Sequence, residues 1–102
     1  MKYELTNTTI EERGSTLYRI RALKDFSDVR KGDLGGYVQS PESLSQKYNA
    51  WVFGDARVFE NARVFGDARV FENARVYGDA RVYGYARVRG NARVYGYVWI
   101  IF

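Results

Sequence analysis

Arginine and aromatic side chains recur at fixed spacing in the second half of the chain, and these residue types are well suited to binding a partner. Arginine follows alanine every six residues from Arg57 to Arg93, and most of these arginines have an aromatic residue two positions later. A guanidinium stacks on aromatic rings and binds carboxylates or phosphates through two parallel hydrogen bonds. The candidate partner-binding residues are Arg57, Arg63, Arg69, Arg75, Arg81, Arg87, Arg89, Arg93, Phe59, Phe65, Tyr77, Tyr83 and Tyr95.

Three interpretations of these rows are open. Arginine and aromatic residues are enriched in the hot spots of protein interfaces. The same residue types stack on bases and neutralise phosphates when a protein binds a single-stranded nucleic acid. Alternatively, the rows are cross-strand ladders that stabilise a sheet and bind nothing.

Few residues could carry out catalysis. The chain has no cysteine and no histidine, which removes thiolate chemistry and the commonest protein base and metal ligand. Asp55, Asp67 and Asp79 recur beside glycine, where aspartate is an ordinary turn former. No insertion between the repeats is available to form a pocket. We therefore expect no catalytic residue, no metal site and no cofactor, and a protein that is not an enzyme.

A six-residue period places all the arginines on one side of the chain. Valine recurs every six residues from Val52 onwards, with alanine four positions after each of the first seven valines. Because side chains alternate across a strand, Ala56 and Val58 face inward, and the arginine and aromatic residues face outward. A helix cannot keep a strict period of six on one face.

A two-residue punctuation, mostly Gly-Asp or Glu-Asn, ends each six-residue unit. We expect each corner to need one residue with a left-handed backbone. Glycine supplies it at the first corner position, and at Glu-Asn corners we expect Asn61 and Asn73 to supply it, because asparagine tolerates a positive φ.

This pattern resembles the hexapeptide-repeat left-handed β-helix family, in which three units form one triangular coil. The resemblance implies an all-β, left-handed parallel β-helix with coils stacked about 4.8 Å apart and columns of residues eighteen positions apart. The wider family includes acyltransferases, which use a histidine base in a cleft built with long loops. This chain has neither feature, so the resemblance argues against an enzyme.

The segment before the repeats contains DFSDV at residues 25–29, GGYV at 35–38 and LSQ at 44–46. With these pieces it resembles the opening of a group of bacterial and prophage hexapeptide-repeat proteins with no settled activity. The resemblance covers residues 17–98. It implies the fold and the capping, and it implies no chemistry.

Residues 1–37 are expected to form an N-terminal β-hairpin and capping segment, and residues 38–102 the β-helix solenoid, as one folding unit. An isolated hairpin is marginally stable, so we expect it to cover the open first coil. Val38, Leu44 and Ala50 stand eighteen, twelve and six residues before Ala56. This spacing predicts that all three lie in the alanine column, with residues 40–43 bulging around Pro41.

The carboxyl end departs from the pattern with the apolar run Val98, Trp99, Ile100, Ile101 and Phe102. Ile100 is expected to continue the inner valine column, and Trp99, Ile101 and Phe102 to point outward or past the last coil. An exposed apolar edge marks an association site. We expect two copies to meet here as a homodimer, and the alternative is that Trp99 and Phe102 fold back as a private cap.

Residues 52–63 and 64–75 are identical in sequence. A period of twelve does not match an eighteen-residue coil, so we interpret the copy as duplication of a modular unit and not as a structural period. Many outward side chains are then inherited copies.

The net charge of +4 is mild for a nucleic-acid-binding protein. The amino terminus has no secretory hydrophobic run and no segment reaches transmembrane length, so we expect a cytoplasmic protein with no membrane contact. We expect a protein-interaction module, and the prophage resemblance favours a small phage-encoded inhibitor of a host defence system, comparable with an anti-CRISPR protein. The alternatives are a self-associating structural solenoid and a nucleic-acid binder.

Overall fold

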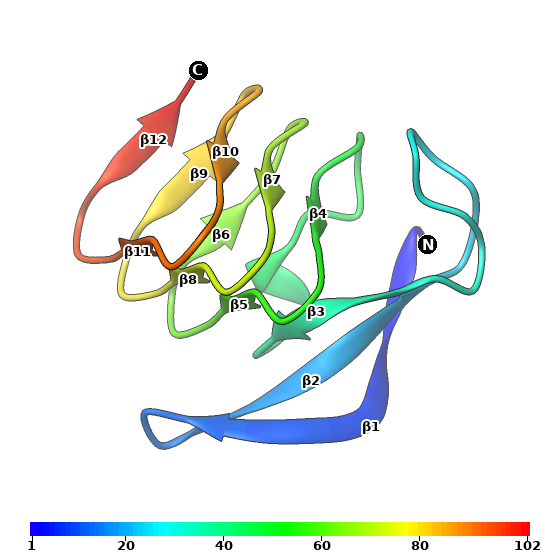
Figure 1. Cartoon of the computed structure of the whole chain (residues 1–102), viewed down its shortest axis with the longest axis horizontal. Coiled ribbons are helices and arrows are strands. Elements are labelled where there is room, and N and C mark those ends of the chain that lie inside the picture. Colours follow the sequence, from blue (N-terminus) through cyan, green and yellow to red (C-terminus); the bar gives the residue numbers. More distant parts are fainter.

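The computed structural model describes residues 1–102 as a left-handed β-helix of short parallel strands, with a β-hairpin at its N-terminal end (Figure 1). The elements in chain order are β1 (Tyr3–Glu12), β2 (Ser15–Ala22), β3 (Leu34–Val38), the single-turn 3-10 helix η1 (Pro41–Ser43), β4 (Trp51–Val52), β5 (Arg57–Val58), β6 (Arg63–Val64), β7 (Arg69–Val70), β8 (Arg75–Val76), β9 (Arg81–Tyr83), β10 (Arg87–Val88), β11 (Arg93–Val94) and β12 (Trp99–Ile101).

Three sheets form the sides of the prism. Their strand orders are β1-β2-β3-β5-β8-β11, β10-β7-β4 and β12-β9-β6. Neighbouring solenoid strands are parallel and eighteen residues apart, so Val52 lies beside Val70, and Val70 beside Val88. The predicted fold and its eighteen-residue columns are confirmed.

The core is built from the inward alanines and valines. Ala56, Val58, Ala68 and Val70 are completely buried, and they belong to one cluster that runs along the axis of the solenoid. Small and β-branched side chains suit this position because three sheets must approach a common axis and each inward side chain has little space.

The first residue of every solenoid corner has a left-handed backbone. Glycine supplies it at six corners, and Glu60 and Glu72 supply it at the other two, with φ of 59° and 63°. Our expectation that Asn61 and Asn73 take this role is wrong. The carboxylate of Glu60 accepts a hydrogen bond from the N–H of Gly78 in the next coil at 2.9 Å, and this contact offsets a backbone strain of about 1–3 kcal/mol.

The first coil is two residues longer than the others. Val38 pairs with Val58 and Leu44 bridges to Val64, each twenty residues further along the chain. On β4, Trp51 pairs with Arg69, which is eighteen residues further along. Val38 and Leu44 therefore lie in the valine column, and our placement of them in the alanine column is wrong. The two extra residues lie between Leu44 and Ala50, and not in residues 40–43.

The base of the hairpin closes the N-terminal end of the core, as predicted. Tyr3 and Ile20 are completely buried in the core cluster. The Tyr3 hydroxyl donates to the carbonyl of Leu44 at 2.5 Å, and the buried Lys2 Nζ donates to the carbonyl of Ala50 at 2.7 Å. Both bonds satisfy backbone groups beside the extra residues of the first coil, and burial lowers the pKa of Lys2 to about 8.

A register shift between Leu5 and Thr9 bends β1, and the bend is visible in Figure 1. β2 pairs with β3 along its second half, which joins the hairpin to one side of the prism. Beyond the bend, the hairpin lies over the outside of β5 and β8. One hairpin therefore covers both the end of the core and part of an outer face.

We predict that corner glycines differ in their tolerance of alanine according to the coil stacked on them. A Cβ at Gly78 would lie 2.8 Å from the nitrogen of Gly96, whereas a Cβ at Gly54 would meet nothing closer than 3.8 Å. Both residues have a positive φ, so both substitutions carry the same strain of roughly 1–2 kcal/mol. Gly78→Ala should lower the free energy of unfolding in urea by clearly more than Gly54→Ala. Equal losses would contradict the close stacking of corners.

Candidate interaction surfaces

The outward arginines and aromatic residues are distributed over three unequal faces. We call the side formed by β5, β8 and β11 the hairpin face, the side formed by β4, β7 and β10 the groove face, and the side formed by β6, β9 and β12 the open face. The sequence predicts equivalent ladders on all three, and the structure separates them by what covers each one.

The aromatic row of the hairpin face is largely covered. Phe59, Tyr77 and Tyr95 stack in a column with ring centroids 5.0 and 5.2 Å apart. Phe59 is 0% exposed and Tyr77 is 8% exposed, because Leu17 of the hairpin packs on them with Ile10 and Tyr37 alongside. The expectation that Phe59 and Tyr77 present an outward surface is therefore wrong, and Tyr95 is the exposed ring of this column.

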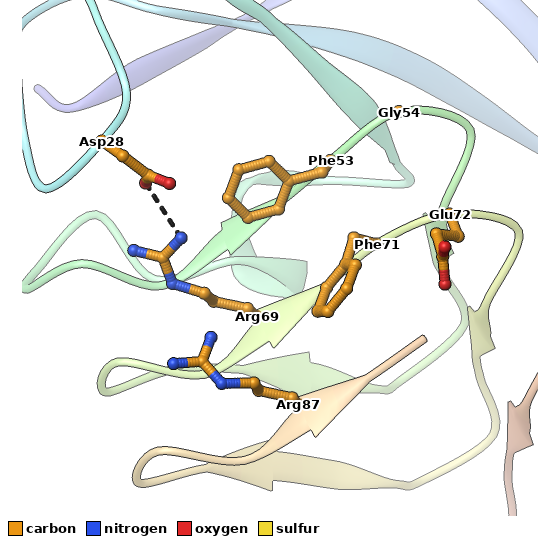
Figure 2. Close-up of a pocket in the computed structure, with 7 residues that line it drawn as sticks. All are labelled: Asp28, Phe53, Gly54, Arg69, Phe71, Glu72 and Arg87. Carbon is orange, nitrogen blue, oxygen red and sulfur yellow. Dashed lines mark hydrogen bonds and ion pairs between the residues drawn. The ribbon is translucent and has the colours of Figure 1, made fainter. Parts of the chain in front are cut away.

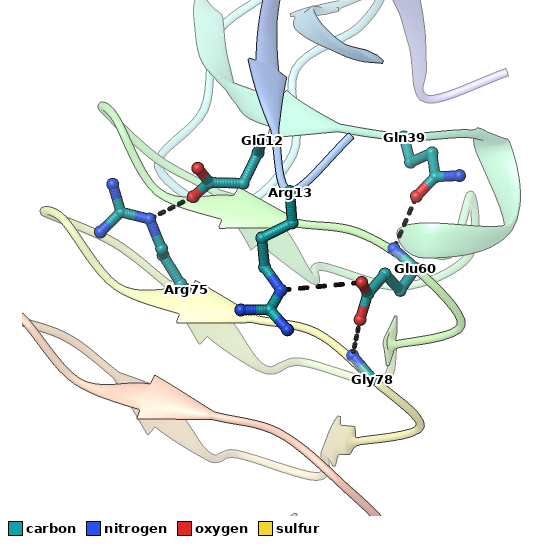
Figure 3. A network of polar contacts seen from close by, with 6 residues as sticks. All are labelled: Glu12, Arg13, Gln39, Glu60, Arg75 and Gly78. Carbon is teal, nitrogen blue, oxygen red and sulfur yellow. Dashed lines mark hydrogen bonds and ion pairs between the residues drawn. The ribbon is translucent and has the colours of Figure 1, made fainter. Parts of the chain in front are cut away.

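Two of the three arginines of the hairpin face, Arg57 and Arg75, bind the tip of the hairpin, and Figure 3 shows the contact of Arg75. The half-buried carboxylate of Glu12 forms ion pairs with Arg57, at 3.4 Å, and with Arg75. The next residue, Arg13, forms an ion pair with Glu60 at 3.8 Å. These contacts fix the tip against the solenoid, and they occupy two of the candidate partner-binding arginines.

On the open face, aromatic rings of successive coils are in contact, with Phe65 and Tyr83 half-buried and Trp99 at the arginine position of β12. The rings of Phe65 and Tyr83 stack at 4.8 Å, and Trp99 meets Tyr83 edge-on at 6.0 Å. The arginines of this face turn toward backbone carbonyls: Arg63 donates to Glu42 and Arg81 to Asn61, at 3.3 and 3.1 Å. Because the guanidiniums of Arg63 and Arg81 are engaged in this way, the open face is more apolar than its sequence indicates.

The last coil exposes most of the apolar run. Trp99 is 65% exposed, Ile101 59% and Phe102 92%, so Trp99 and Phe102 do not fold back as a private cap. Val98 is exposed, and Ile100 packs against the core as the inner column predicts. A shallow cavity of about 320 Å³ lies beside this run, between Tyr85 and Phe102.

The groove face carries an open cavity of about 470 Å³ (Figure 2). Phe53 and Phe71 meet edge-to-face at 6.1 Å on one side of it. Arg69 lies beside Phe53 and donates to Asp28 at 2.9 Å, and this hydrogen bond holds the pKa of Asp28 below its ordinary value. Arg87, on the next strand, has no hydrogen bond or ion pair with the protein.

Two further candidates, Arg89 and Arg93, are exposed and likewise have no polar partner. Ion pairs with carboxylates therefore involve three of the eight candidate arginines: Arg57, Arg69 and Arg75. Sequence reasoning missed the carboxylates, because Glu12 and Asp28 lie outside the repeats and no local pattern connects them to arginines some forty to sixty residues away.

Trp51 shows the same effect of distant packing. It stands at the arginine position of the first coil, where an exposed aromatic residue would join the groove face. Tyr3 and Phe26 pack edge-on against it at 6.0 and 5.2 Å, and it is 1% exposed. Trp51 therefore belongs to the N-terminal cap and not to a binding surface.

No group of three or more cysteine, histidine, aspartate or glutamate residues is arranged to hold a metal ion. None of the helical structure has the length and apolar character needed to cross a membrane.

A family model described as the YdcK beta solenoid repeat matches residues 74–90. This segment contains β8, β9 and β10 and so corresponds to about one coil. The chain is a β-solenoid repeat protein. No curated protein matches it significantly, and the β-solenoid match concerns the fold and assigns no activity.

We predict that Glu12 holds the hairpin on its face. Glu12→Gln removes the shared carboxylate and leaves two neighbouring guanidiniums without a counterion, so the free energy of unfolding in urea should fall by about 1–2 kcal/mol. Glu11→Gln is the matched control, because Glu11 is exposed and bonds only to Thr16. Equal stability of the two variants would show that the ion pairs do not fix the tip.

Proposed function

We propose that the protein is a non-catalytic protein-interaction module, a rigid prism that binds through its last coil and the adjoining open face. The distribution of apolar side chains carries this proposal. Seven of the ten exposed large hydrophobic residues lie between residues 85 and 102. A concentration of this kind at one end of a small protein is typical of an association surface.

The use of the carboxylates supports a role without catalysis. Glu60 and Glu72 accept hydrogen bonds from the corner glycines Gly78 and Gly90, and Glu12 pairs with two arginines. An acid or base for catalysis needs freedom to exchange a proton with a substrate. These three side chains are instead committed to the contacts that hold the coils and the hairpin together.

We propose that the last coil binds another copy of the same chain. β10, β11 and β12 are edge strands, and edge strands offer backbone groups for pairing with another chain. The hairpin covers the opposite end of the solenoid, which opposes head-to-tail stacking into a filament. Two copies would therefore meet through like ends about a two-fold axis, and this geometry favours a closed dimer over a self-assembling structural solenoid.

We expect light scattering to give the mass of a dimer for the intact chain and of a monomer for the Trp99→Ser, Phe102→Ser variant. The matched control is Leu34→Ser, Tyr48→Ser, because these side chains are 56% and 73% exposed in the first coil, far from the last one. The control should remain a dimer. A monomeric intact chain would exclude the dimer and leave the last coil available to a different protein.

The concrete version of this proposal is a phage-encoded inhibitor of a host defence system, acting in the cytoplasm in the manner of an anti-CRISPR protein. Its support is the resemblance of residues 17–98 to prophage proteins. If it is right, expression of the chain in a CRISPR-defended host should restore plaque formation by a targeted phage, and the Trp99→Ser, Phe102→Ser variant should restore less. Unchanged plaque counts would contradict the proposal of a phage-encoded inhibitor, but not the proposal of a protein-interaction module.

A further inference from the structure

The groove face contains a cation, Arg87, that forms no ion pair with a carboxylate of the protein. Arg87 on β10 lies in direct register with Arg69 on β7, so the two guanidiniums extend from neighbouring strands, as Figure 2 shows. Asp28 and Ser27 hold Arg69 in place through its two terminal nitrogens. Arg87 is exposed and has neither contact.

The two carboxylates that line the groove are already engaged. Asp28 pairs with Arg69, and Glu72 accepts the N–H of Gly90 at 2.6 Å. Arg89, two residues beyond Arg87 on the same strand face, adds a second exposed positive charge. This end of the groove face is therefore positive, and a carboxylate from outside would find an unpaired planar donor there.

An apolar surface lies beside the unpaired guanidinium. Phe53 and Phe71 are half-buried and form one wall of the cavity of about 470 Å³. Phe71 stands two residues after Arg69, which is in register with Arg87, so in the strand direction Phe71 lies two residues beyond Arg87 on the neighbouring strand. On β10 itself this position is taken by Arg89. Side chains at positions i and i+2 of an extended peptide have this same spacing of roughly 6.5–7 Å.

We propose that the groove binds an extended segment of a partner protein in which an acidic residue is followed two positions later by an aromatic residue. The carboxylate accepts two hydrogen bonds from Arg87, and the aromatic ring packs on Phe71 and Phe53. Phe53 and Phe71 lie on a different face from the apolar row of Phe65, Tyr83 and Trp99. Arg87 also borders the cavity beside Ile101 and Phe102, so the site adjoins the proposed dimer end, and the Trp99→Ser, Phe102→Ser variant is needed to separate the two.

The geometry favours a peptide over a nucleic acid. A phosphate backbone that follows the face would pass the carboxylates of Asp28 and Glu72, which repel it. Phe53 and Phe71 meet edge-to-face with an interplanar angle of 80°, so they do not form the row of open ring faces on which successive bases stack. A single carboxylate at Arg87 avoids both difficulties.

The test titrates the peptide acetyl-Asp-Gly-Phe-amide into the full-length protein and measures the dissociation constant by NMR. The side-chain Nε–H signal of Arg87 is one of the signals observed. Arg87→Gln should weaken binding about fivefold, as expected for loss of one charge-assisted pair at a partly exposed site. Arg93→Gln is the matched control, because Arg93 occupies the same position of the next six-residue unit, is exposed and has no polar partner. It should change the affinity by less than about twofold.

Two control peptides separate the two halves of the site. Acetyl-Asn-Gly-Phe-amide lacks the charge and acetyl-Asp-Gly-Ser-amide lacks the ring, and both should bind more weakly than the parent peptide. Repeating the titration with the Trp99→Ser, Phe102→Ser variant separates this site from self-association, since the groove residues are unchanged. No binding of the parent peptide, equal losses for Arg87→Gln and Arg93→Gln, or tighter binding of oligothymidylate would each overturn the proposal.

Discussion

The hydrogen-bond ladder between coils is the interaction on which the rest of this structure depends. The N–H of every outward arginine from Arg57 to Arg81 donates to a carbonyl seventeen residues further along the chain, as from Arg57 to Ala74 and from Arg75 to Ala92. A chain can keep this ladder only if each coil has the same length and turns each corner with a left-handed residue. The strict six-residue spacing of alanine, valine and arginine meets that requirement.

The first coil departs from this rule because other groups replace the ladder there. No coil precedes it, so no ladder N–H group is available to its carbonyls, and each buried carbonyl without a partner costs about 1–3 kcal/mol. Lys2 and Tyr3 donate to these carbonyls, and the side chain of Gln46 accepts the N–H groups of both residues. The cap and the irregular coil therefore stabilise each other, which explains how a longer coil is tolerated at this end.

The hairpin also makes the surface asymmetric. The repeats alone would give three similar faces, each with a row of arginines and a row of aromatic rings. By covering Phe59 and Tyr77 and by pairing Glu12 with Arg57, the hairpin buries the aromatic rings of β5 and β8 on one face and leaves Tyr95 of β11 exposed. The other two faces also differ from each other. Arg63 and Arg81 on the open face bind backbone carbonyls, whereas Arg87 on the groove face has no polar partner. Any selectivity for partners arises from this asymmetry more than from the repeats.

The sequence predicts the parts of this structure that depend on periodicity. The inward column of Val52 and Val70 and the outward rows follow from alternation along a strand and from the repeat length. The longer first coil could not be predicted from spacing, since the six-residue period places Leu44 in the alanine column and gives no sign of the two extra residues that move it to the valine column. The ion pair of Glu12 with Arg75 depends on a bend in β1 and on a sequence separation of 63 residues, and no local signal marks it.

The corner glutamates explain why duplication in steps of twelve residues is compatible with this fold. In the duplicated segment glutamate occupies every second corner, and one coil contains three corners. Because three is odd, the residue stacked on a glutamate is always a glycine: Glu60 meets Gly78, and Glu72 lies between Gly54 and Gly90. Copying a complete eighteen-residue coil would instead place carboxylate over carboxylate, with repulsion between them. Duplication in steps of twelve keeps every acidic corner beside a backbone donor, so such a solenoid can lengthen by this step without stacking like charges.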